Sequence, residues 1–314
     1  MKRVLVTGGA GFIGSHVVER LVEQEFDVVV LDDFSTGREE NLASVIDRIT
    51  LIRGSILDER ALREALSNVE AVIHLAARIS VEESMRDPQL YYKVNVEGTR
   101  RLLEEARGKI NLLVFMSSAA VYGSPIQLPI RESHPLRPLS PYGETKVLGE
   151  RIMEKWAREN QAVAVILRLF NAYGPRQEGN PYAGVVAKFL ERISRRLPPV
   201  IYGDGFQTRD FINVRDVASL IAHVLIKPPQ EGGARIYNLG TGRETRIIDL
   251  AKLMASLAGL NVEPIHKPAR EGDIRRSVAC IEKIRVETGW KPQIDLPKGL
   301  RGLLQPLSTQ NPPY

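Results

Sequence analysis

The sequence predicts an α/β protein built on a doubly wound parallel sheet, with a smaller C-terminal α/β substrate lobe. Short continuous apolar runs alternate with amphipathic segments through the first half of the chain. Such runs are typical of parallel strands that are buried on both faces. A glycine-rich turn follows the first run, and polar residues follow a later one, so both should lie at the carboxyl edge of the sheet.

The predicted strands and helices alternate along the chain. We expect strands at 4–6, 26–32, 49–53, 71–75, 112–116 and 163–169, and helices at 15–24, 59–66, 88–107 and 142–160. After residue 173 proline, glycine and arginine become frequent and the alternation is less regular. Residues 1–173 are therefore predicted to form one domain and 174–314 mainly a substrate lobe. The segments 211–224 and 236–239, near 211–240, are predicted to return to the first domain.

Composition narrows the class of protein. The chain has 314 residues, of which 43% are hydrophobic and 26% charged, as in an ordinary globular protein. No apolar run approaches the roughly 20 residues needed to span a bilayer, so we expect no membrane partner. The chain enters the glycine turn directly and has one cysteine, which predicts a cytoplasmic protein without a signal peptide. Its five histidines are scattered, so no metal site is expected.

The net charge of +5 and the isoelectric point near 9.3 allow two interpretations, a nucleic-acid partner or an anionic small substrate. The densest basic clusters lie in helix-like segments that also contain glutamate, which favours a solvated face. No stripe of aromatic residues accompanies the basic residues. We therefore expect no nucleic-acid partner.

The glycine turn Gly8-Gly9-Ala10-Gly11-Phe12-Ile13-Gly14 follows a predicted strand and opens a helix. Glycines let a backbone approach a pyrophosphate, and the helix N-terminus then faces the negative charge. The next strand ends in Asp32-Asp33, where a carboxylate can accept hydrogen bonds from a ribose and repel the extra phosphate of NADP. Together these features predict a Rossmann-type domain that binds NAD. A purely structural glycine turn is the weaker alternative.

The stretch SPYGETK places Tyr142 four residues before Lys146, on one face of a predicted helix. An ammonium beside a phenol stabilises the phenolate, so Lys146 is predicted to lower the pKa of Tyr142. Ser117 and Ser118 end another buried strand at the same edge of the sheet. A strand cap and a surface pair could explain these residues one by one. Their joint occurrence favours a proton-transfer site beside a nicotinamide.

These motifs resemble the extended short-chain dehydrogenase/reductase family, and within it most closely the UDP-glucose (UDP-galactose) 4-epimerases. The resemblance runs from about residue 2 to about residue 305. Its motifs are TGGAGFIG at 7–14, HLAA at 74–77, NVEGT at 95–99, SSAAVYG at 117–123, YGETK at 142–146 and REGD at 270–273. It implies an isomerase with NAD as cofactor, which converts UDP-galactose to UDP-glucose through a transient 4-keto sugar and bound NADH.

The resemblance also implies roles for single residues. Tyr142 would remove the proton of the sugar 4-hydroxyl, Ser118 would relay it, and Lys146 would hold the nicotinamide ribose. The implied cofactor-binding residues are Gly8, Gly11, Phe12, Ile13, Gly14, Asp32, Asp33, Ser55, Ile56, Leu75, Ala76, Ala77, Asn95, Ser117, Tyr142 and Lys146. The implied substrate-binding residues are Ser118, Tyr142, Asn171, Arg209, Arg270, Asp273 and Ser277.

The substrate-binding residues would divide the nucleotide sugar among them. Asn171, Arg209 and Arg270 would meet the diphosphate and Asp273 the uridine ribose, and guanidinium groups suit phosphates. Ser277 would be a gate beside the sugar 2-position, small enough to admit N-acetylated sugars. An exposed loop ion pair is the alternative for Arg270 and Asp273. The family further implies a homodimer in which helices 88–107 and 142–160 pair across a twofold axis.

The sequence departs from the family pattern at two positions near the expected cofactor. Ser55 stands where many relatives have an aspartate that contacts adenine, and Ile79 replaces a basic residue. We therefore expect NAD to be held less tightly than is usual in the family.

Rival reactions on the same scaffold need groups that this chain lacks. Ala119 and Ala120 occupy the positions of the acid and base of the 4,6-dehydratases, and UDP-glucuronate decarboxylases carry a glutamate at the second position. The remaining alternatives are UDP-glucuronate or UDP-N-acetylhexosamine 4-epimerases. A non-catalytic NAD-binding regulator is less favoured because it has no use for Tyr142 and Lys146, and an RNA-binding relative because the aromatic stripe is missing.

Overall fold

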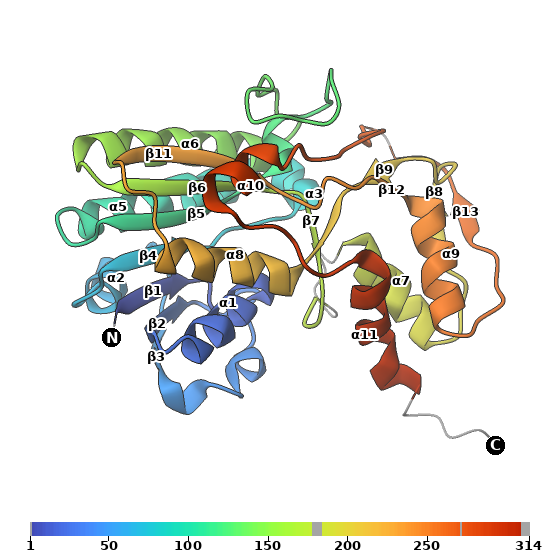
Figure 1. Cartoon of the computed structure of the whole chain (residues 1–314), viewed down its shortest axis with the longest axis horizontal. Helices are drawn as coiled ribbons and strands as arrows, with labels where there is room; N and C mark the ends of the chain where they lie inside the picture. Colours follow the sequence, from blue (N-terminus) through green and yellow to red (C-terminus); the bar gives the residue numbers. More distant parts are fainter. Residues whose placement is uncertain (1, 178–183, 271, 309–314) are drawn as a thin grey trace.

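The computed structural model describes residues 2–177, 184–270 and 272–308. Seven parallel strands form its central sheet in the order β11-β6-β5-β4-β1-β2-β3 (Figure 1). They are β1 (Arg3–Thr7), β2 (Asp27–Asp32), β3 (Ile49–Arg53), β4 (Ala71–His74), β5 (Leu112–Ser118), β6 (Val163–Leu169) and β11 (Gly233–Leu239). The strand order reverses between β1 and β4, and ligands bind at such a reversal in open α/β sheets. The predicted Rossmann-type α/β fold is confirmed.

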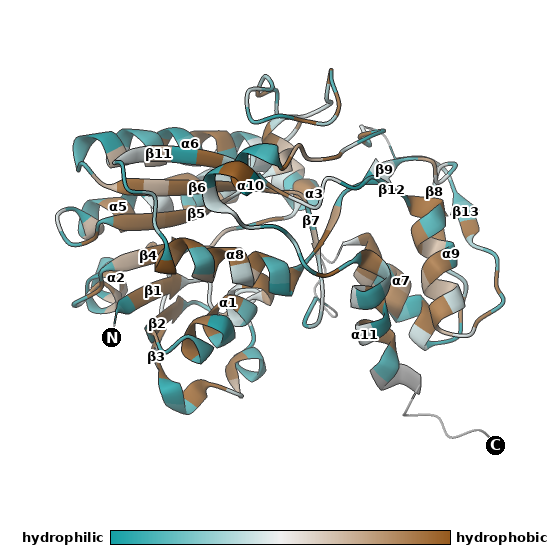
Figure 2. Cartoon of the chain, in the orientation of Figure 1, coloured by the Kyte–Doolittle hydropathy of each residue, from teal (hydrophilic) through white to brown (hydrophobic). Residues whose placement is uncertain are grey.

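Helices cover both faces of the sheet. Alternate residues of each strand point to opposite faces, so each strand contributes apolar side chains to two cores. Val4 and Val6 pack in the core that includes α1 (Phe12–Glu23) and α8 (Val214–Ile226). Leu5 packs in the opposite core, with α2 (Glu59–Ala65), α5 (Thr99–Ala106) and α6 (Pro141–Glu159). Figure 2 shows the apolar colour along β4, β5 and β6, as expected for strands buried on both sides.

The helix predicted at 88–107 is composite. It consists of α4 (Pro88–Tyr91), a π-helical segment η3 (Tyr92–Gly98) and α5. The wider turn lies at Asn95, whose carbonyl oxygen accepts a hydrogen bond from the Thr99 hydroxyl at 2.6 Å. Apolar periodicity does not distinguish a π-turn from an α-turn, and such turns are frequent at functional sites.

The helix α3 (Val81–Arg86) was not predicted. The Ser80 hydroxyl caps it by accepting the Glu83 N–H at 3.0 Å. The Ser-x-x-Glu spacing of a capping box was the available signal. Three 3₁₀ segments also occur, η1 (Glu39–Leu42), η2 (Ile46–Arg48) and η4 (Ala119–Val121).

A smaller unit lies to the right of the sheet in Figure 1. Three two-stranded sheets contribute to it: β7 (Asn171–Tyr173) with β10 (Phe211–Asn213), β9 (Thr208–Arg209) with β12 (Thr245–Arg246), and β8 (Val200–Tyr202) with β13 (Ile265–Lys267). Its helices α7 (Val185–Ser194), α9 (Ile247–Leu257) and α11 (Leu296–Ser308) surround a core that includes Phe189, Leu250 and Leu300. The short helix α10 (Glu282–Thr288) packs against β11 instead.

The described part of the chain contains no candidate for a membrane span or a metal cluster. None of its helices is long and apolar enough to cross a membrane. Within the same residues, no group of three His, Cys, Asp or Glu side chains is arranged to hold a metal ion.

Candidate functional site

A cavity of about 550 Å³ lies at the carboxyl ends of the central strands. This volume is in the usual range for small-molecule sites. The predicted residues that line it are Gly8, Gly11, Phe12, Ile13, Gly14, Asp32, Asp33, Ser55, Ile56, Leu75, Ala76, Ala77, Ser117, Ser118, Tyr142, Lys146 and Asn171. Five predicted residues lie elsewhere: Asn95, Arg209, Arg270, Asp273 and Ser277. The topology thus brings most of the predicted site to one place.

The glycine turn closes one side of the cavity, and Gly8 and Gly14 have no room for a side chain. Gly8 has a φ of +71° and packs against the segment that follows β4. A Cβ added to Gly8 would lie 2.7 Å from the Ala76 nitrogen. A Cβ on Gly14 would overlap the Gly8 carbonyl oxygen. The first-turn N–H groups of α1 have no helical partners and point toward its N-terminal end. This end of the helix is therefore suited to an anion.

Asp32 holds the end of β2 against this turn. Its two carboxylate oxygens accept the Ala10 N–H at 2.8 Å and the Phe34 N–H at 2.9 Å. Burial raises the pKa of the Asp32 carboxyl, and the two backbone hydrogen bonds oppose that shift. Each oxygen keeps a second lone pair with which it can accept a hydroxyl from a ligand. Asp33 is exposed and accepts the Ser35 N–H at 3.0 Å.

The segment after β3 forms the next part of the wall. The Ser55 hydroxyl accepts the Leu57 N–H at 3.3 Å, and Ile56 is buried. Asp58 does not replace the family aspartate missing at Ser55, because it is the N-cap of α2 and accepts the N–H groups of Arg60 and Ala61.

A chain of buried hydrogen bonds supports the wall formed by residues 75–77. His74 lies between the hydroxyls of Thr7 and Thr99, at 2.8 and 2.9 Å, and Thr7 also accepts the Ala76 N–H at 3.3 Å. Burial lowers the pKa of His74 to about 3, and the charge of Lys146 adds to the shift, so the imidazole is neutral. The ring therefore has one donor and one acceptor nitrogen, which matches its two hydroxyl partners.

Asn95 lies behind the cavity wall and does not line it. Its side-chain amide donates to the Arg78 carbonyl at 2.9 Å and to the Thr145 hydroxyl at 3.0 Å, and its oxygen accepts the Arg78 N–H at 2.8 Å. Thr145 in turn donates to the Tyr142 carbonyl at 2.8 Å. Asn95 thus fixes the wall relative to the helix that carries Tyr142.

Tyr142 and Ser118 meet in the cavity. Ser140 caps α6 by accepting the Gly143 N–H at 3.2 Å, and Pro141 occupies the first helical position, so Tyr142 lies in the first turn. Ser118 ends β5, and its side chain makes a hydrogen bond with the Tyr142 side chain. The Tyr91 ring packs edge-on against Tyr142, with the ring centroids 6.4 Å apart.

Lys146 lies one helical turn after Tyr142. Its ammonium donates to the Met116 carbonyl at 2.8 Å and lies 6.0 Å from the centroid of the Tyr142 ring. Burial lowers the pKa of Lys146 to about 8, and the charge of Glu150 opposes this shift.

The structure corrects the predicted direction of the Tyr142 shift. Burial raises the pKa of Tyr142 above its usual value, and the hydrogen bond from Ser118 acts in the opposite direction. Lys146 does not lower it as predicted, because its ammonium is directed to the Met116 carbonyl. Sequence spacing places the two residues on one helix face but does not determine where the ammonium points.

The other predicted substrate residues gather on the smaller unit beyond Asn171. Arg209 pairs with Asp273 and also donates to the Ile274 carbonyl at 2.7 Å. Arg270 lies over the Tyr202 ring, 4.1 Å from its centroid. The loop ion pair given as the alternative would join Asp273 to Arg270, but the partner of Asp273 is Arg209. Glu271 of the REGD motif lies outside the described residues.

A buried carboxylate that the sequence analysis missed ties this group to the cavity. Asp210 accepts the Thr241 N–H at 2.8 Å, the Gly242 N–H at 2.9 Å and the Ala279 N–H at 3.1 Å. Its carbonyl accepts the N–H of Asn171 at 3.0 Å, so it joins the cavity edge to the segment that follows Ser277. Its position between Arg209 and an apolar run was the only signal in the sequence.

Other cavity residues also escaped the sequence analysis. They are Leu31, Ser35, Thr36, Gly54, Leu57, Arg78, Leu90, Val94, Met116, Leu169, Phe170, Ala172, Gln177 and Gly184. Most lie one or two residues from a predicted site residue. Extending the predicted site by two residues along the chain would have included them. Ile79, expected near the cofactor, also lines the cavity.

Comparison with known proteins identifies the family. The family described as the NAD dependent epimerase/dehydratase family matches residues 4–240. The UDP-glucose 4-epimerase of Mycolicibacterium smegmatis is 40% identical over 304 residues, which is 95% of this chain and 96% of that protein. The resemblance stated from the motifs is thereby confirmed.

Two solved structures share the fold over nearly the whole chain. The UDP-glucose 4-epimerase of Thermotoga maritima, crystallised with UDP-glucose, has a TM-score of 0.91 and 37% identity, covering 98% of this chain and 99% of that one. A UDP-N-acetylglucosamine 4-epimerase from Methanobrevibacter ruminantium, in complex with UDP-N-acetylmuramic acid, has a TM-score of 0.92 and 32% identity, covering 99% of both. The chain therefore belongs to the NAD dependent epimerase/dehydratase family.

Proposed function

We propose that this protein is an NAD-dependent 4-epimerase of a UDP-hexose, which interconverts UDP-galactose and UDP-glucose through a transient 4-keto sugar. The observation that carries the proposal is the convergence of Tyr142, Ser118 and Lys146 in the cavity that the glycine turn closes. Ala119 and Ala120, in η4, offer no further acid or base. This agrees with a reaction that removes and returns the proton of the sugar 4-hydroxyl and the hydride of C4.

The residues of the cavity fit NAD. The close packing of the glycine turn, in which a Cβ on Gly8 or Gly14 would meet backbone atoms, brings the N-terminus of α1 to the cavity, where it suits the pyrophosphate, and Asp32 suits a ribose. Ser117, on β5, and Lys146, on α6, both line the cavity. They would lie toward the nicotinamide end of the cofactor. When bound, NAD supplies the hydride chemistry by accepting a hydride from the sugar and returning it.

The remaining steps belong to side chains of this chain. The Tyr142 oxygen takes the proton of the sugar 4-hydroxyl and later gives it back. Because burial raises the pKa of Tyr142, the phenolate needs stabilisation, which the hydrogen bond from Ser118 can provide. Ser118 also lies where it can hydrogen-bond the reacting oxygen.

The substrate lobe, predicted as residues 174–314, would hold the nucleotide. Asn171 lines the cavity, and the β7–β10 pair leads from it to Arg209. Arg209 and Arg270 offer guanidinium groups to the diphosphate, and Asp273 offers a carboxylate to the uridine ribose. For this, Asp273 must exchange part of its pairing with Arg209 for ribose hydroxyls.

Incubation with UDP-galactose tests the proposed function. The purified protein is mixed with UDP-galactose, with and without added NAD, and the sugar nucleotides are separated by chromatography and identified by proton NMR. UDP-glucose without net accumulation of reduced cofactor supports the proposal. No conversion, with NAD demonstrably bound, rejects UDP-galactose and directs the search to UDP-glucuronate.

Adding a methyl group at Gly14 should weaken cofactor binding strongly. Gly14→Ala places a methyl group against the Gly8 carbonyl, so the turn must shift. We expect NAD affinity, measured by isothermal titration calorimetry, to fall at least about 100-fold, equivalent to about 3 kcal/mol. Gly302→Ala is the matched control, since it also adds a methyl group to a helix but meets no atom within 4 Å. Unchanged affinity in Gly14→Ala would remove the turn from the cofactor site.

A UDP-N-acetylhexosamine is a second candidate substrate, favoured by the small side chain of Ser277. The adjacent Val278 carbonyl accepts the Ile130 N–H at 2.9 Å, so the backbone here is held in place. We expect Ser277→Tyr to lower kcat/KM for UDP-N-acetylglucosamine at least about tenfold, the discrimination that a few contacts can supply. UDP-galactose turnover serves as the internal control. A parent chain that does not exchange UDP-N-acetylglucosamine and UDP-N-acetylgalactosamine excludes this second activity.

We also propose a homodimer in the cytoplasm. α5 and α6 pack side by side with exposed outer positions, as pairing of these segments across a twofold axis requires. A single cysteine, Cys280, agrees with a reducing compartment. Light scattering that gives the mass of one 35.1 kDa chain would reject the dimer.

A further inference from the structure

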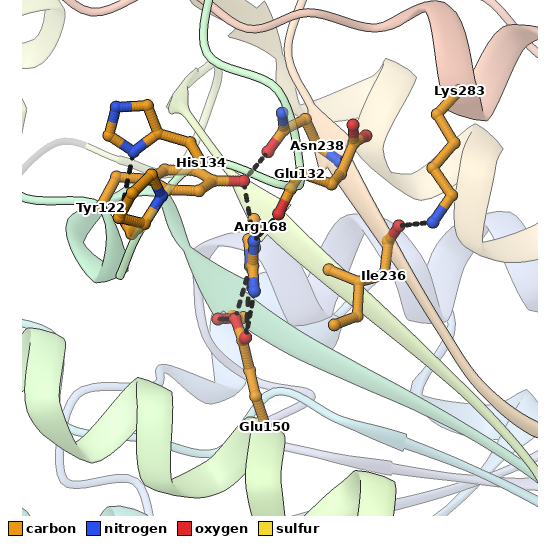
Figure 3. Close-up of polar contacts among 10 residues, drawn as sticks. Tyr122, Glu132, His134, Glu150, Arg168, Ile236, Asn238 and Lys283 are labelled. Atoms are coloured by element: carbon orange, nitrogen blue, oxygen red, sulfur yellow. Dashed lines mark hydrogen bonds and ion pairs between the residues drawn. The ribbon is translucent and has the colours of Figure 1, made fainter. Parts of the chain in front are cut away.

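A buried ion pair lies directly behind the cavity. The Arg168 guanidinium, on β6, donates through Nη2 and Nε to the Glu150 carboxylate, on α6, at 2.7 and 3.0 Å (Figure 3). Both side chains are almost completely buried, at 3% and 4% exposure. The pair is therefore a fixed, desolvated part of the structure.

Further hydrogen bonds satisfy both members of the pair. Ser117 donates to Glu150 at 2.5 Å, and the other end of Arg168 donates to the Tyr122 hydroxyl at 3.0 Å and the Glu132 carbonyl at 2.9 Å. The Tyr122 hydroxyl in turn donates to the Asn238 side-chain oxygen at 2.5 Å. Figure 3 shows Arg168 between Glu150 on one side and Tyr122 and Asn238 on the other.

Glu150 is also next to Lys146. The two residues are four positions apart on α6 and so lie on one helix face. Each fixes α6 to the end of β5, because Lys146 donates to the Met116 carbonyl at 2.8 Å while Glu150 accepts the Ser117 hydroxyl. The following residue on β5 is Ser118. Two successive turns of the helix are thus fixed to the strand that carries the hydroxyl partner of Tyr142.

Stability alone does not explain a pair in this place. Replacing a buried ion pair by apolar residues of similar volume is often neutral or stabilising. The core that α6 packs against already provides apolar packing around Met153 and Trp156. A negative charge one turn from the buried ammonium of Lys146 has a more specific consequence.

We propose that Glu150 is a positioning residue for Lys146: its carboxylate, held by Arg168 and Ser117, keeps the Lys146 ammonium charged and directed along the end of β5. The inference rests on the proposed function, in which Lys146 serves the cofactor and Tyr142. Arg168 holds the Glu150 carboxylate through its Nε and Nη2 groups, and Glu150 lies one helical turn after Lys146 on α6.

The other groups around Lys146 do not supply this charge. His74, on β4, is neutral because it is buried between two hydroxyls. Tyr142, on α6 itself, is held protonated by burial. The Phe115 ring on β5 faces the ammonium at 5.1 Å and contributes a cation–π contact only. Glu150 is thus the carboxylate that opposes the burial of Lys146.

The test reads the ionisation of Lys146 without relying on turnover. The full chain, without added nucleotide, is treated with trace acetic anhydride across a pH series, and acetylation of Lys146 is quantified by mass spectrometry. The neutral amine reacts, so the midpoint reports the ionisation of Lys146. Glu150→Gln removes the charge and keeps the shape, and Glu150→Leu with Arg168→Met removes the whole pair without leaving an unpaired charge.

The control variant is Tyr122→Phe. It breaks the network beyond Arg168 and leaves the bonds among Ser117, Glu150 and Arg168 in place. The parent midpoint should lie near pH 8. In Glu150→Gln it should move down by about 1 unit, the effect of removing one close opposite charge. In the double variant it should also move down, and in Tyr122→Phe it should stay.

A midpoint unchanged in Glu150→Gln and in the double variant, with the parent's circular dichroism retained, overturns the inference. In the NAD-loaded protein with UDP-galactose, the alkaline limb of kcat should move in parallel with the midpoint, while a merely structural role would lower kcat equally at all pH values. A parent chain that turns over no UDP-galactose would refute the proposed function and leave the labelling result to decide the inference separately.

Discussion

Tyr142→Phe should lower kcat for UDP-galactose by about 100-fold or more while NAD remains bound. The substitution removes only the hydroxyl that meets Ser118, and general acid–base groups commonly contribute factors of this size. The phenyl ring keeps the edge-on contact with Tyr91, so the cavity wall should not move. The measurement is turnover at saturating substrate together with NAD affinity by calorimetry.

Tyr237→Phe is the matched control for this substitution. Tyr237 is a buried tyrosine on β11 whose hydroxyl donates to Glu287 at 2.8 Å, away from the residues that line the cavity. Its loss should reduce stability by about 1 kcal/mol, as for one hydrogen bond, and leave kcat near the parent value. If Tyr142→Phe retained near-normal turnover, Tyr142 would have no part in the proton transfer.

Arg168→Met should have the largest effect on stability. It leaves the Glu150 carboxylate buried without its cation and removes donors to Tyr122 and the Glu132 carbonyl. Breaking a buried pair on one side costs about 3–5 kcal/mol. We expect the free energy of unfolding, measured by urea denaturation monitored by tryptophan fluorescence, to fall by this amount.

The double variant Glu150→Leu with Arg168→Met separates the buried charge from the loss of packing. With both charges removed, no ion is left without a partner, so most of the lost stability should return. A coupling energy near zero in this double-mutant cycle would show that the two charges do not depend on each other. The same variants then carry the ionisation test of Lys146.

The sheet was predictable because each of its strands coincides with a local apolar pattern in the sequence. Continuous apolar runs such as FDVVVLD and VAVILRL are too short for a helix and too uniform for a half-exposed strand, and β2 and β6 lie there. The composite helix over 88–107 was not predictable, because apolar periodicity does not show where an α-helix widens into a π-turn.

The cavity was predictable to the extent that it lies at strand ends and helix starts. The glycine turn, Asp32, Ser118 and Tyr142 follow from that rule. The pairing of Arg209 with Asp273 joins residues 64 positions apart and follows from no local pattern. Arg168 is a charge inside an apolar strand, yet only the fold shows that its partner is Glu150, on the helix of Lys146.

The measurement that tests the proposed reaction most directly is the fate of the hydrogen at the sugar C4. UDP-galactose carrying deuterium at C4 is converted by the NAD-loaded protein in ordinary water, and the product is examined by NMR and mass spectrometry. The proposal predicts that UDP-glucose keeps the deuterium at C4, because the hydride that leaves the sugar returns to the opposite face of the same carbon. Replacement of the deuterium by solvent hydrogen would contradict it.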